Sequence, residues 1–476
     1  MNYFKKKLYL FFILILISFL IIIFIILPPS TKSNIHNAYN NKFKIITHPF
    51  KLIYDKKYNY NHKNYKRNII KREKLENNQS VTVNKYELED EIISGAHVLN
   101  LNIYDTEFLS IDDNKYIPSN MPYIDFLDNE TILMHYSIGN FALFNYSENS
   151  FKKIQSNYCS IIKKHSFNDC INETEFGIRD IFLDDNHKLY VSSYFSSKND
   201  PACKGLMVFE SEPIDINNPI IFKLFYKTPS CVKEPNPDPS GGRIQRIDEN
   251  NILLSIGDFQ PSHTDILKEN EQEYKNNHVS QNPNSHFGKT ILIDNQGKSS
   301  IYTMGNRNPQ GLYIKEKYII GSEHGPNGGD EINILYQGRN YGWPVVSYGF
   351  AYNEDIEMSK SHEYPYEEPI YYFSPSIGIS EIIVYNSEYF KRWTNKTLVA
   401  SLVSNSLYIV NIDYDKKHAN NMDKIFLGDI TIKDNFKSLD FRIRDMKVSN
   451  DGKIWLITDD NYISYIEKSE NDFKGP

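Results

Sequence analysis

One hairpin pattern recurs along this sequence, and its clearest copy reads IFLDDNHKLYV at residues 181–191. Apolar residues flank an Asp/Asn turn, and the second half is rich in residues that favour β-strands. Similar patterns begin near residues 124, 247, 312, 384 and 446, at intervals of 57 to 72 residues. Repeated short antiparallel strands are the signature of a β-propeller, so the spacing predicts an all-β fold with six blades.

The predicted propeller also indicates where a ligand would bind. Loops from all blades converge at the central channel, and we expect the functional site there. The usual sequence signatures of serine hydrolases, Walker-type nucleotide-binding proteins, zinc metalloproteases and EF-hand proteins are absent. Beyond the N-terminal segment no long stretch keeps a 3.6-residue periodicity, which disfavours α/β folds.

The charge balance disfavours nucleic acid as a partner. The chain has 53 Lys and Arg against 60 Asp and Glu, a net charge of -7, whereas phosphate binding needs an excess of cations. Residues 32–74 alone carry twelve basic and two acidic residues. The remaining body is therefore strongly acidic, which suits a hard cation such as calcium.

The N-terminal segment predicts a membrane anchor. Residues 8–27 are almost entirely Leu, Ile and Phe, long enough to cross a hydrocarbon core of about 30 Å. The sequence PPS follows at residues 28–30, where a cleaved signal peptide would have a small-x-small site. We therefore expect a cytoplasmic basic end at residues 1–7, a transmembrane helix at 8–27, a tether rich in Asn, Lys and Tyr at 28–88, and the propeller at 89–476.

Basic residues on both sides of the anchor leave its orientation nearly undecided, and the cysteines favour one choice. All four follow the anchor, and their even number fits disulfides in an oxidising compartment. The body is thus expected in a periplasm or on an exterior face. Three pairings are possible; short loops favour Cys159 with Cys170 and Cys203 with Cys231, and four buried free thiols are the alternative.

Three runs in the middle of the chain are unusually rich in Gly, Asn, Pro and charged residues. They read GNRNPQGL at 305–312, SEHGPNGGDEIN at 322–333 and NYGWP at 340–344. Glycines allow backbone carbonyls to turn toward one point, as a calcium site with few carboxylates requires, and Arg307 can form paired hydrogen bonds with a carboxylate. Tight turns at the propeller corners are the alternative interpretation.

These runs resemble the pyrroloquinoline quinone (PQQ)-dependent glucose/sorbosone dehydrogenase family, whose fold is a six-bladed propeller. Weaker similarity extends from about residue 124 to 467 and includes GGR at 241–243, IGD at 256–258 and RIRD at 442–445. The resemblance implies that the cofactor is contacted by four residues, Arg307, Asn308, Arg442 and Arg444. Each arginine has an alternative role as an ion-pair partner at the surface.

The resemblance also implies a calcium site. Gly325 and Pro326 match the positions whose carbonyls bind the calcium that activates the quinone. Calcium would act as a Lewis acid and assist hydride acceptance by PQQ. Asp330 and Glu331 match acidic positions that either support this loop or bind a further calcium.

The departures from the family pattern concern the catalytic base. The family's catalytic histidine, which takes the proton of the sugar hydroxyl, is replaced by Pro239, although the residue that orients it is retained as Asp258. A lysine of some members aligns near Val403, and a glutamine aligns near Glu175. Loss of a general base costs about 10²–10⁴ in rate.

Other histidines could take over as the base. His286 and His324 are the candidates, with His263 nearby in sequence, although a structural role is the commoner one for any single histidine. The sequence thus supports two hypotheses. One is a membrane-anchored, calcium-assisted, PQQ-dependent aldose dehydrogenase that passes electrons to an unknown acceptor. The alternative is a non-catalytic propeller that binds a sugar or protein ligand.

Overall fold

The computed structural model describes residues 80–82, 85–87, 92–93, 97–104, 111–112, 115–116, 121–137, 139–167, 177–233, 240–259, 277–350, 362–428, 430–432, 437–439, 441–459 and 462–472. All of them belong to the second of two compact units, which spans 73–476. The predicted anchor at 8–27 lies outside the described residues. Within the described part of the chain, no helix has the length and hydropathy needed to cross a membrane.

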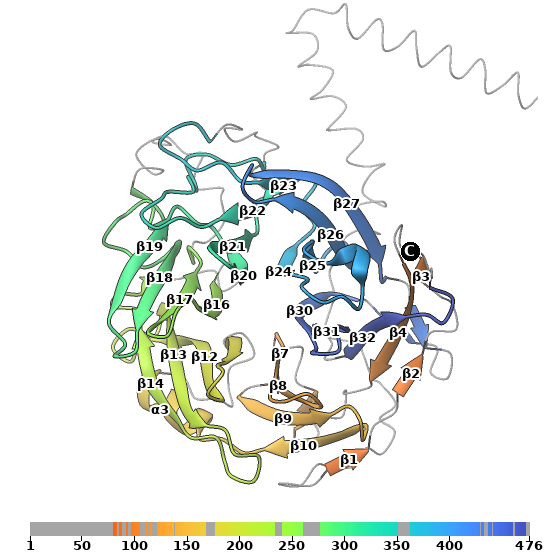
Figure 1. Ribbon diagram of the computed structural model, residues 1–476. Helices are drawn as coiled ribbons and strands as arrows, with labels where there is room; N and C mark the ends of the chain where they lie inside the picture. Colours follow the sequence, from red (N-terminus) through yellow and green to blue (C-terminus); the bar gives the residue numbers. More distant parts are fainter. Residues whose placement is uncertain are drawn as a thin grey trace, which may run out of the picture. The chain divides into compact units, whose positions relative to one another are not determined.

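Six antiparallel sheets of four or more strands form a ring of blades around a central axis, which confirms the predicted all-β propeller (Figure 1). Blade 1 contains β7 (Tyr123–Phe126), β8 (Thr131–Ser137), β9 (Asn140–Asn145), β10 (Ser150–Ile154) and β1 (Ser80–Thr82). Blade 2 contains β11 (Ile178–Leu183), β12 (Lys188–Ser196), β13 (Cys203–Pro213), β14 (Phe222–Lys227) and β15 (Val232–Lys233). Blade 3 contains β16 (Gly241–Arg246), β17 (Asn251–Ile256), β18 (Lys289–Asp294) and β19 (Ser299–Met304).

The other three blades complete the ring. Blade 4 contains β20 (Pro309–Lys315), β21 (Tyr318–Glu323), β22 (Asp330–Ile334) and β23 (Tyr371–Phe373). Blade 5 contains β24 (Ile379–Val384), β25 (Thr397–Ser401), β26 (Ser406–Asp413) and β27 (His418–Phe426). Blade 6 contains β30 (Ile443–Val448), β31 (Ile454–Thr458), β32 (Ile463–Lys468), β4 (Val98–Tyr104), β2 (Lys85–Glu87) and β3 (Ile92–Ile93).

Blade 6 closes the ring by joining the two ends of the described chain. Its inner three strands come from the C-terminal end, whereas β4 precedes the inner strands of all the other blades in sequence and pairs with β32. Leu101 of β4 lies opposite Ile466, and both side chains are fully buried. The N-terminal strand therefore holds the first and last parts of the propeller together.

A few elements lie outside the blades. They are the hairpins β5–β6 (Ile111–Asp112 and Lys115–Tyr116) and β28–β29 (Ile430–Ile432 and Lys437–Leu439), the helix α3 (Tyr158–His165) and the short helix η3 (Lys391–Trp393). The predicted disulfide between Cys203 and Cys231 is present and connects β13 to the segment before β15. Cys159 of α3 is also disulfide-bonded, and Cys170 lies outside the described residues.

The predicted hairpins form for local reasons. In blade 2 the Asp184 carboxylate accepts hydrogen bonds from the backbone N–H groups of Asn186 and Lys188, and this closes the turn between β11 and β12. Asp side chains stabilise turns in this way because they reach the backbone two residues ahead. The apolar residues of the flanking strands then pack against neighbouring blades, as Ile181 and Val191 do in the core.

The inner strand of five blades carries a β-bulge near its start. The pairing register shifts between Ile178 and Asp180, Gly241 and Ile244, Pro309 and Gly311, Ile379 and Ile382, and Ile443 and Asp445. Bulges bend a strand and redirect side chains, often beside functional sites. The irregular backbone therefore lies where the six inner strands approach the axis.

Candidate active site at the propeller axis

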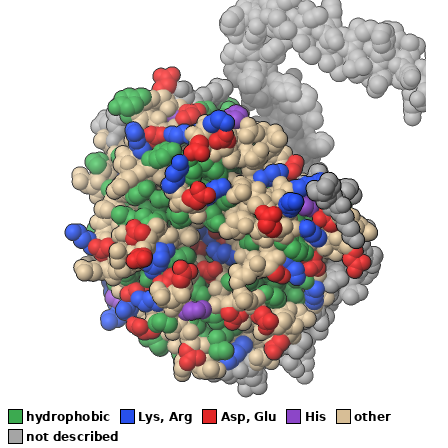
Figure 2. All heavy atoms as spheres, viewed as in Figure 1, with side chains coloured by type: hydrophobic (Ala, Val, Ile, Leu, Met, Phe, Trp, Pro, Cys, Tyr) green, Lys and Arg blue, Asp and Glu red, His purple; other side chains and the backbone are tan. Residues whose placement is uncertain are grey.

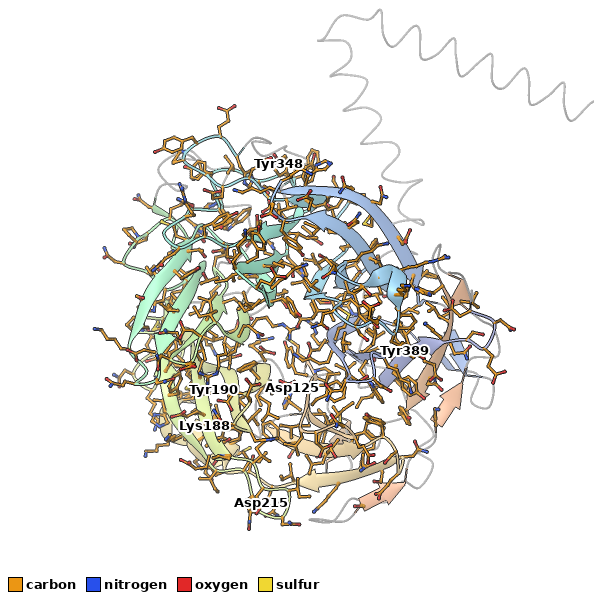
Figure 3. The ribbon with its side chains drawn as sticks, viewed as in Figure 1. Asp125, Lys188, Tyr190, Asp215, Tyr348 and Tyr389 are labelled. Atoms are coloured by element: carbon orange, nitrogen blue, oxygen red, sulfur yellow. A yellow bond between two sulfur atoms is a disulfide. The ribbon has the colours of Figure 1, made fainter. Side chains whose placement is uncertain are left out.

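Charged side chains gather at the axis. The face shown in Figure 2 is hollowed at its centre, where Lys, Arg, Asp and Glu side chains are visible. Figure 3 shows Asp125 on the inner strand β7, whereas Asp215 lies at the rim. The axial position at each bulge, together with the matching position of the regular strand β7, is occupied by Tyr123, Asp180, Arg243, Gly311, Glu381 and Asp445.

Burial and neighbouring charges shift the pKa values of the buried carboxyl groups at the axis. Burial raises the pKa of Glu381 well above its ordinary value, although Arg243 opposes this shift. Burial thus favours the protonated form of Glu381, which shares a hydrogen bond with Asp445, whose pKa is lowered despite its own burial because Lys447 and Arg243 face it. Burial likewise raises the pKa of Asp180 to about 6. Buried charged side chains in contact with one another therefore occupy the axis.

Arg307 is held at the start of β20 by several contacts. Its backbone N–H donates to Glu323 Oε2 (2.9 Å), and its Nη1 donates to the carbonyl of His324 (3.0 Å). Its guanidinium lies 5.3 Å from the ring centroid of Trp343, within cation–π distance. The GNRN, SEHGP and NYGWP runs, which are separate in sequence, therefore meet at this one side chain.

Asn308 lies beside Arg307 and connects two blades. Its Oδ1 accepts hydrogen bonds from Gly241 N (3.1 Å) in blade 3 and from Gln310 Nε2 (2.8 Å) in blade 4. Its carbonyl accepts the backbone N–H of His324 (3.0 Å). The side-chain oxygen is therefore satisfied within the protein, and its amide nitrogen is the group that could donate to a ligand.

Arg442 and Arg444 share one carboxylate. Arg442 Nε donates to Asp459 Oδ2 (3.0 Å) and Arg444 Nε donates to Asp459 Oδ1 (2.7 Å). The Arg444 side chain is 7% exposed and the Arg442 side chain 39%. Both arginines therefore have the ion-pair role that was the alternative to cofactor binding, and each retains further N–H groups. Asp459 was not expected from the sequence, because no local motif connects it with the arginines.

Asp330 organises the glycine-rich loop. Its Oδ2 accepts three backbone N–H groups, from Ile377, Gly378 and Ile379 (3.0, 2.8 and 3.1 Å). Its Oδ1 accepts the N–H of Gly325 (3.0 Å) and the hydroxyl of Ser376 (2.9 Å). Five donors surround this carboxylate, so Asp330 supports the loop.

Pro326 and Gly325 are fixed by the same neighbours. The Ser376 hydroxyl shares its one proton between Asp330 Oδ1 and the Pro326 carbonyl, which lies 3.2 Å away. A Cβ added at Gly325 would lie 2.2 Å from the carbonyl oxygen of Gly329, so no larger residue fits there. The loop is thus closely packed and its carbonyl groups are held in place.

Glu331 belongs to a buried polar group next to the loop. Its Oε2 accepts a hydrogen bond from Asn333 Nδ2 (3.1 Å), and its Oε1 lies 3.6 Å from His362 Nε2. Burial raises its pKa well above the ordinary value, and the charge of Glu323 raises it further. Burial also raises the pKa of Glu323 to about 7. Among the described residues no group of three or more His, Cys, Asp or Glu is arranged to hold a metal ion.

His324 lies between the groups described above. Burial lowers its pKa, Asp330 opposes this shift, and Arg307 and Arg444 lower it further. A hydrogen bond with the Ile379 backbone raises the pKa, which indicates that the ring donates there. Its Nε2 is buried and has no hydrogen-bond partner among the described residues. His324 is therefore neutral, with one ring nitrogen available as an acceptor.

Asp258 has partners that the sequence did not indicate. Trp343 Nε1 donates to Asp258 Oδ2 (2.7 Å), and His278 Nε2 lies 3.8 Å from the same oxygen. His278 Nδ1 accepts the N–H of Ser280 (3.2 Å), so its proton is on Nε2 facing Asp258. Burial lowers the pKa of His278 to about 3. Nδ1 already accepts a hydrogen bond and the pKa is low, so His278 is unsuited to accept a proton from a substrate.

His286 lies away from the axis. Its Nδ1 is 2.6 Å from the hydroxyl of Tyr226 on β14, and the two rings are stacked. Because β14 is far from the inner strand of blade 2, His286 is placed toward the rim. Pro239, Glu175 and His263 lie outside the described residues. Val403 is 55% exposed and packs on Gly378.

The residues present fit a planar anionic cofactor. The charges of Arg307 and Arg444 both lower the pKa of His324, and Arg442 and Arg444 both donate to Asp459. Guanidinium groups bind carboxylates with paired hydrogen bonds. The buried acceptor nitrogen of His324 adds one polar group that a ligand would satisfy. The fit to calcium rests on the carbonyl groups of the 325–326 loop alone.

Comparison with known proteins agrees with this geometry. The family model described as Glucose / Sorbosone dehydrogenase matches residues 119–465. The chain is 29% identical over 175 residues to an aldose sugar dehydrogenase of Escherichia coli, covering 36% of this chain and 44% of that protein. It is 33% identical over 156 residues to quinoprotein glucose dehydrogenase B of Acinetobacter calcoaceticus, covering 26% and 31%. These alignments thus span less than half of the two relatives.

Solved structures show the same fold. The apo form of the soluble aldose sugar dehydrogenase of Escherichia coli superposes with a TM-score of 0.55 at 19% identity, covering 74% of this chain and 97% of that one. The PQQ-bound form of an aldose sugar dehydrogenase from Streptomyces coelicolor gives 0.52 at 17% identity, covering 74% and 96%.

Proposed function

Because this chain belongs to the glucose/sorbosone dehydrogenase family, we propose that it is a PQQ-dependent oxidoreductase that oxidises an aldose sugar at C1. The observation that carries the proposal is the surroundings of His324: Arg307 Nη1 donates to its carbonyl, the charges of Arg307 and Arg444 lower its pKa, and the 325–326 loop follows it directly in the chain. The two named relatives, an aldose sugar dehydrogenase and a quinoprotein glucose dehydrogenase, support the substrate class.

In the proposed site, guanidinium groups hold the cofactor. Arg307, Arg442 and Arg444 would bind its carboxylates, and the Asn308 amide would donate to it. Asp459 sets the directions of Arg442 and Arg444. The ring of Trp343 supports Arg307 from one side. PQQ, when bound, supplies the acceptor for a hydride, and calcium held by the Gly325 and Pro326 carbonyls would polarise that acceptor.

We assign the proton-accepting role to His324. Proline at position 239 has no group that accepts a proton, and His278 and His286 are engaged elsewhere. The buried Nε2 of His324 is an acceptor in a neutral ring, and Asp330 favours the protonated form once it arises. His324 would take the proton of the sugar hydroxyl at Nε2 while the hydride leaves C1.

The proposal includes the cellular arrangement. Residues 8–27 would anchor the protein, and residues 28–88 would tether the propeller on the outer side. The Cys203–Cys231 disulfide supports an oxidising compartment. Resistance of the full chain to carbonate extraction, with protease sensitivity of the propeller from outside the cell, is the expected result; release by carbonate would exclude the anchor.

The activity is tested with the full-length chain purified in detergent. With calcium, PQQ and a panel of aldoses, an artificial electron-accepting dye should be reduced only when both sugar and PQQ are present. PQQ binding without dye reduction would favour the second candidate, a propeller that binds a ligand without turnover. That candidate is supported by Pro239 and by the bond between Trp343 and Asp258. No binding of PQQ at all would overturn both cofactor-based functions.

A further inference from the structure

Arg243 of β16 occupies the centre of the axial cluster. Its side chain is 4% exposed, and its Nη1 lies 3.0 Å from Asp180 Oδ1, 3.0 Å from Asp445 Oδ1 and 2.9 Å from Glu381 Oε2. These three partners belong to the inner strands of blades 2, 6 and 5. One nitrogen therefore connects three blades to blade 3.

The rest of the guanidinium reaches the remaining two inner strands. Nε donates to the carbonyl of Gln310 in blade 4 (2.6 Å), and Nη2 donates to the carbonyl of Arg444 in blade 6 (3.1 Å). The guanidinium carbon lies 4.9 Å from the ring centroid of Tyr123 in blade 1. Arg243 thus contacts the inner strands of all five remaining blades.

The two carbonyl contacts fall on strands that carry the proposed cofactor-binding residues. Gln310, whose carbonyl binds Arg243, also donates through its side-chain Nε2 to Asn308 Oδ1 (2.8 Å). Arg444 itself donates to Asp459. A shift of Arg243 would therefore move Asn308 on one side of the axis and Arg444 on the other.

Gly311 allows this approach. It occupies the axial position of blade 4, and a Cβ there would lie 2.4 Å from Ser322 Oγ and 2.8 Å from Ile382 N. Since the residue after Gln310 has no side chain, β20 packs closely against blade 5. The Gln310 carbonyl can then reach the centre.

We propose that Arg243 is a positioning residue that fixes the distance between the Asn308 and Arg444 sides of the site. The proposal rests on the proposed function, because it concerns the same cofactor-binding residues. Arg243 acts through two backbone carbonyls and touches no reacting group. A planar guanidinium donates in several fixed directions at once, whereas a lysine ammonium presents a single point of charge.

The test compares two variants that disturb the same cluster. Arg243→Lys keeps a positive charge among the carboxylates but cannot reach both carbonyls. Glu381→Gln replaces the acid by an amide of nearly the same shape and leaves the two carbonyl contacts of Arg243 intact. We expect the dissociation constant of PQQ, measured by absorbance titration, to rise about tenfold for Arg243→Lys and less than threefold for Glu381→Gln.

A double-mutant cycle with Arg444→Lys separates positioning from general loss of stability. If Arg243 acts through Arg444, the effect of Arg243→Lys on PQQ affinity should shrink to less than threefold in the Arg444→Lys background. Full additivity, or an unchanged dissociation constant in folded Arg243→Lys, would overturn the proposal. If Arg243→Lys does not fold, Arg243→Gln takes its place, since its amide also cannot reach both carbonyls; unchanged PQQ affinity in that folded variant would overturn the proposal.

Hydrogen exchange keeps this inference separate from the cofactor assignment. Failure of the wild-type chain to bind PQQ would overturn the proposed function alone. Amides in residues 306–311 and 441–446 should still exchange faster in Arg243→Lys than in wild type or Glu381→Gln. Unchanged exchange in both segments would overturn the positioning role whether or not PQQ binds.

Discussion

At the scale of single residues, charged side chains in this propeller form groups that hold separate segments of the chain together. Asp459 orients two arginines, Asp330 accepts five donors, and Arg307 joins three loops. The motif residues could be predicted from the sequence because they are adjacent in the chain. Asp459 and His278 could not, because no local motif connects them with partners that lie 15 to 20 positions away and meet them only in the folded chain.

His324 is expected to be the residue on which turnover depends. His324→Asn should lower kcat by about 10²–10⁴-fold, the usual effect of removing a general base, while PQQ still binds. The measurement is steady-state sugar oxidation with parallel PQQ titration. His286→Asn is the matched control, since its ring stacks on Tyr226 away from the axis. Equal kcat in His324→Asn and wild type would show that another group takes the proton.

Asp459 is expected to contribute stability that depends on pH. Burial alone would raise its pKa, but Arg444 and Arg442 outweigh burial and lower the pKa below the ordinary 3.8. A lowered carboxyl pKa stabilises the fold above pH 3.8, and this contribution is lost as the pH falls through the folded-state pKa.

The measurement is chemical unfolding of Asp459→Asn and wild type across pH. The variant should be less stable by about 3 kcal/mol at pH 6 to 7. The difference should shrink below pH 3.8. A difference that stays constant between pH 6 and pH 3 would show that packing, and not charge, is responsible.

At the scale of elements, the β-bulges of the inner strands bring polar residues to the axis. The hairpins and their intervals could be predicted because turn residues and alternating apolar residues are local signals. The bulges could not, since a register shift depends on the partner strand. Gly242 lies within the bulge of β16 with a φ of 116°. A left-handed backbone of this kind favours glycine.

Gly242→Ala is expected to destabilise the protein strongly. An added Cβ would lie 2.3 Å from the Cβ of Arg179, and the backbone conformation is unfavourable for alanine. We expect a loss of more than about 2 kcal/mol in the free energy of unfolding. Gly338→Ala is the control, because Gly338 also has positive φ (78°) but nothing lies within 4 Å of its added Cβ. Equal losses would mean that backbone strain alone explains the effect.

At the scale of the whole molecule, the N-terminal strand β4 completes the last blade. The sequence predicts six repeats but does not show that the sixth blade takes a strand from the other end of the chain. Strands β1 and β2 lie at the end of the 28–88 range that the sequence predicts as tether, and they pair with β10 and β4. The sequence does not predict these strands, because each has only three residues and their composition is as polar as that of the tether.

Ring closure is expected to govern global stability. Leu101→Ala removes a fully buried side chain opposite Ile466, and it should lower the free energy of unfolding by about 2–5 kcal/mol. Differential scanning calorimetry should show one cooperative transition at lower temperature. The neighbouring Asn100→Ala, which removes a partly exposed polar side chain, should change stability by less than about 0.5 kcal/mol. Separate melting of blade 6 in Leu101→Ala would contradict the idea that closure couples all blades.

The pairing of β4 with β32 has a consequence for biosynthesis. Asn102 and Glu467, joined by a side-chain hydrogen bond of 2.8 Å, are 365 positions apart in the chain. During translation β4 leaves the ribosome long before its partner strand β32. The nascent polypeptide must keep one edge of an apolar strand unpaired while the intervening blades are synthesised, so premature aggregation through β4 is the hazard that this topology creates.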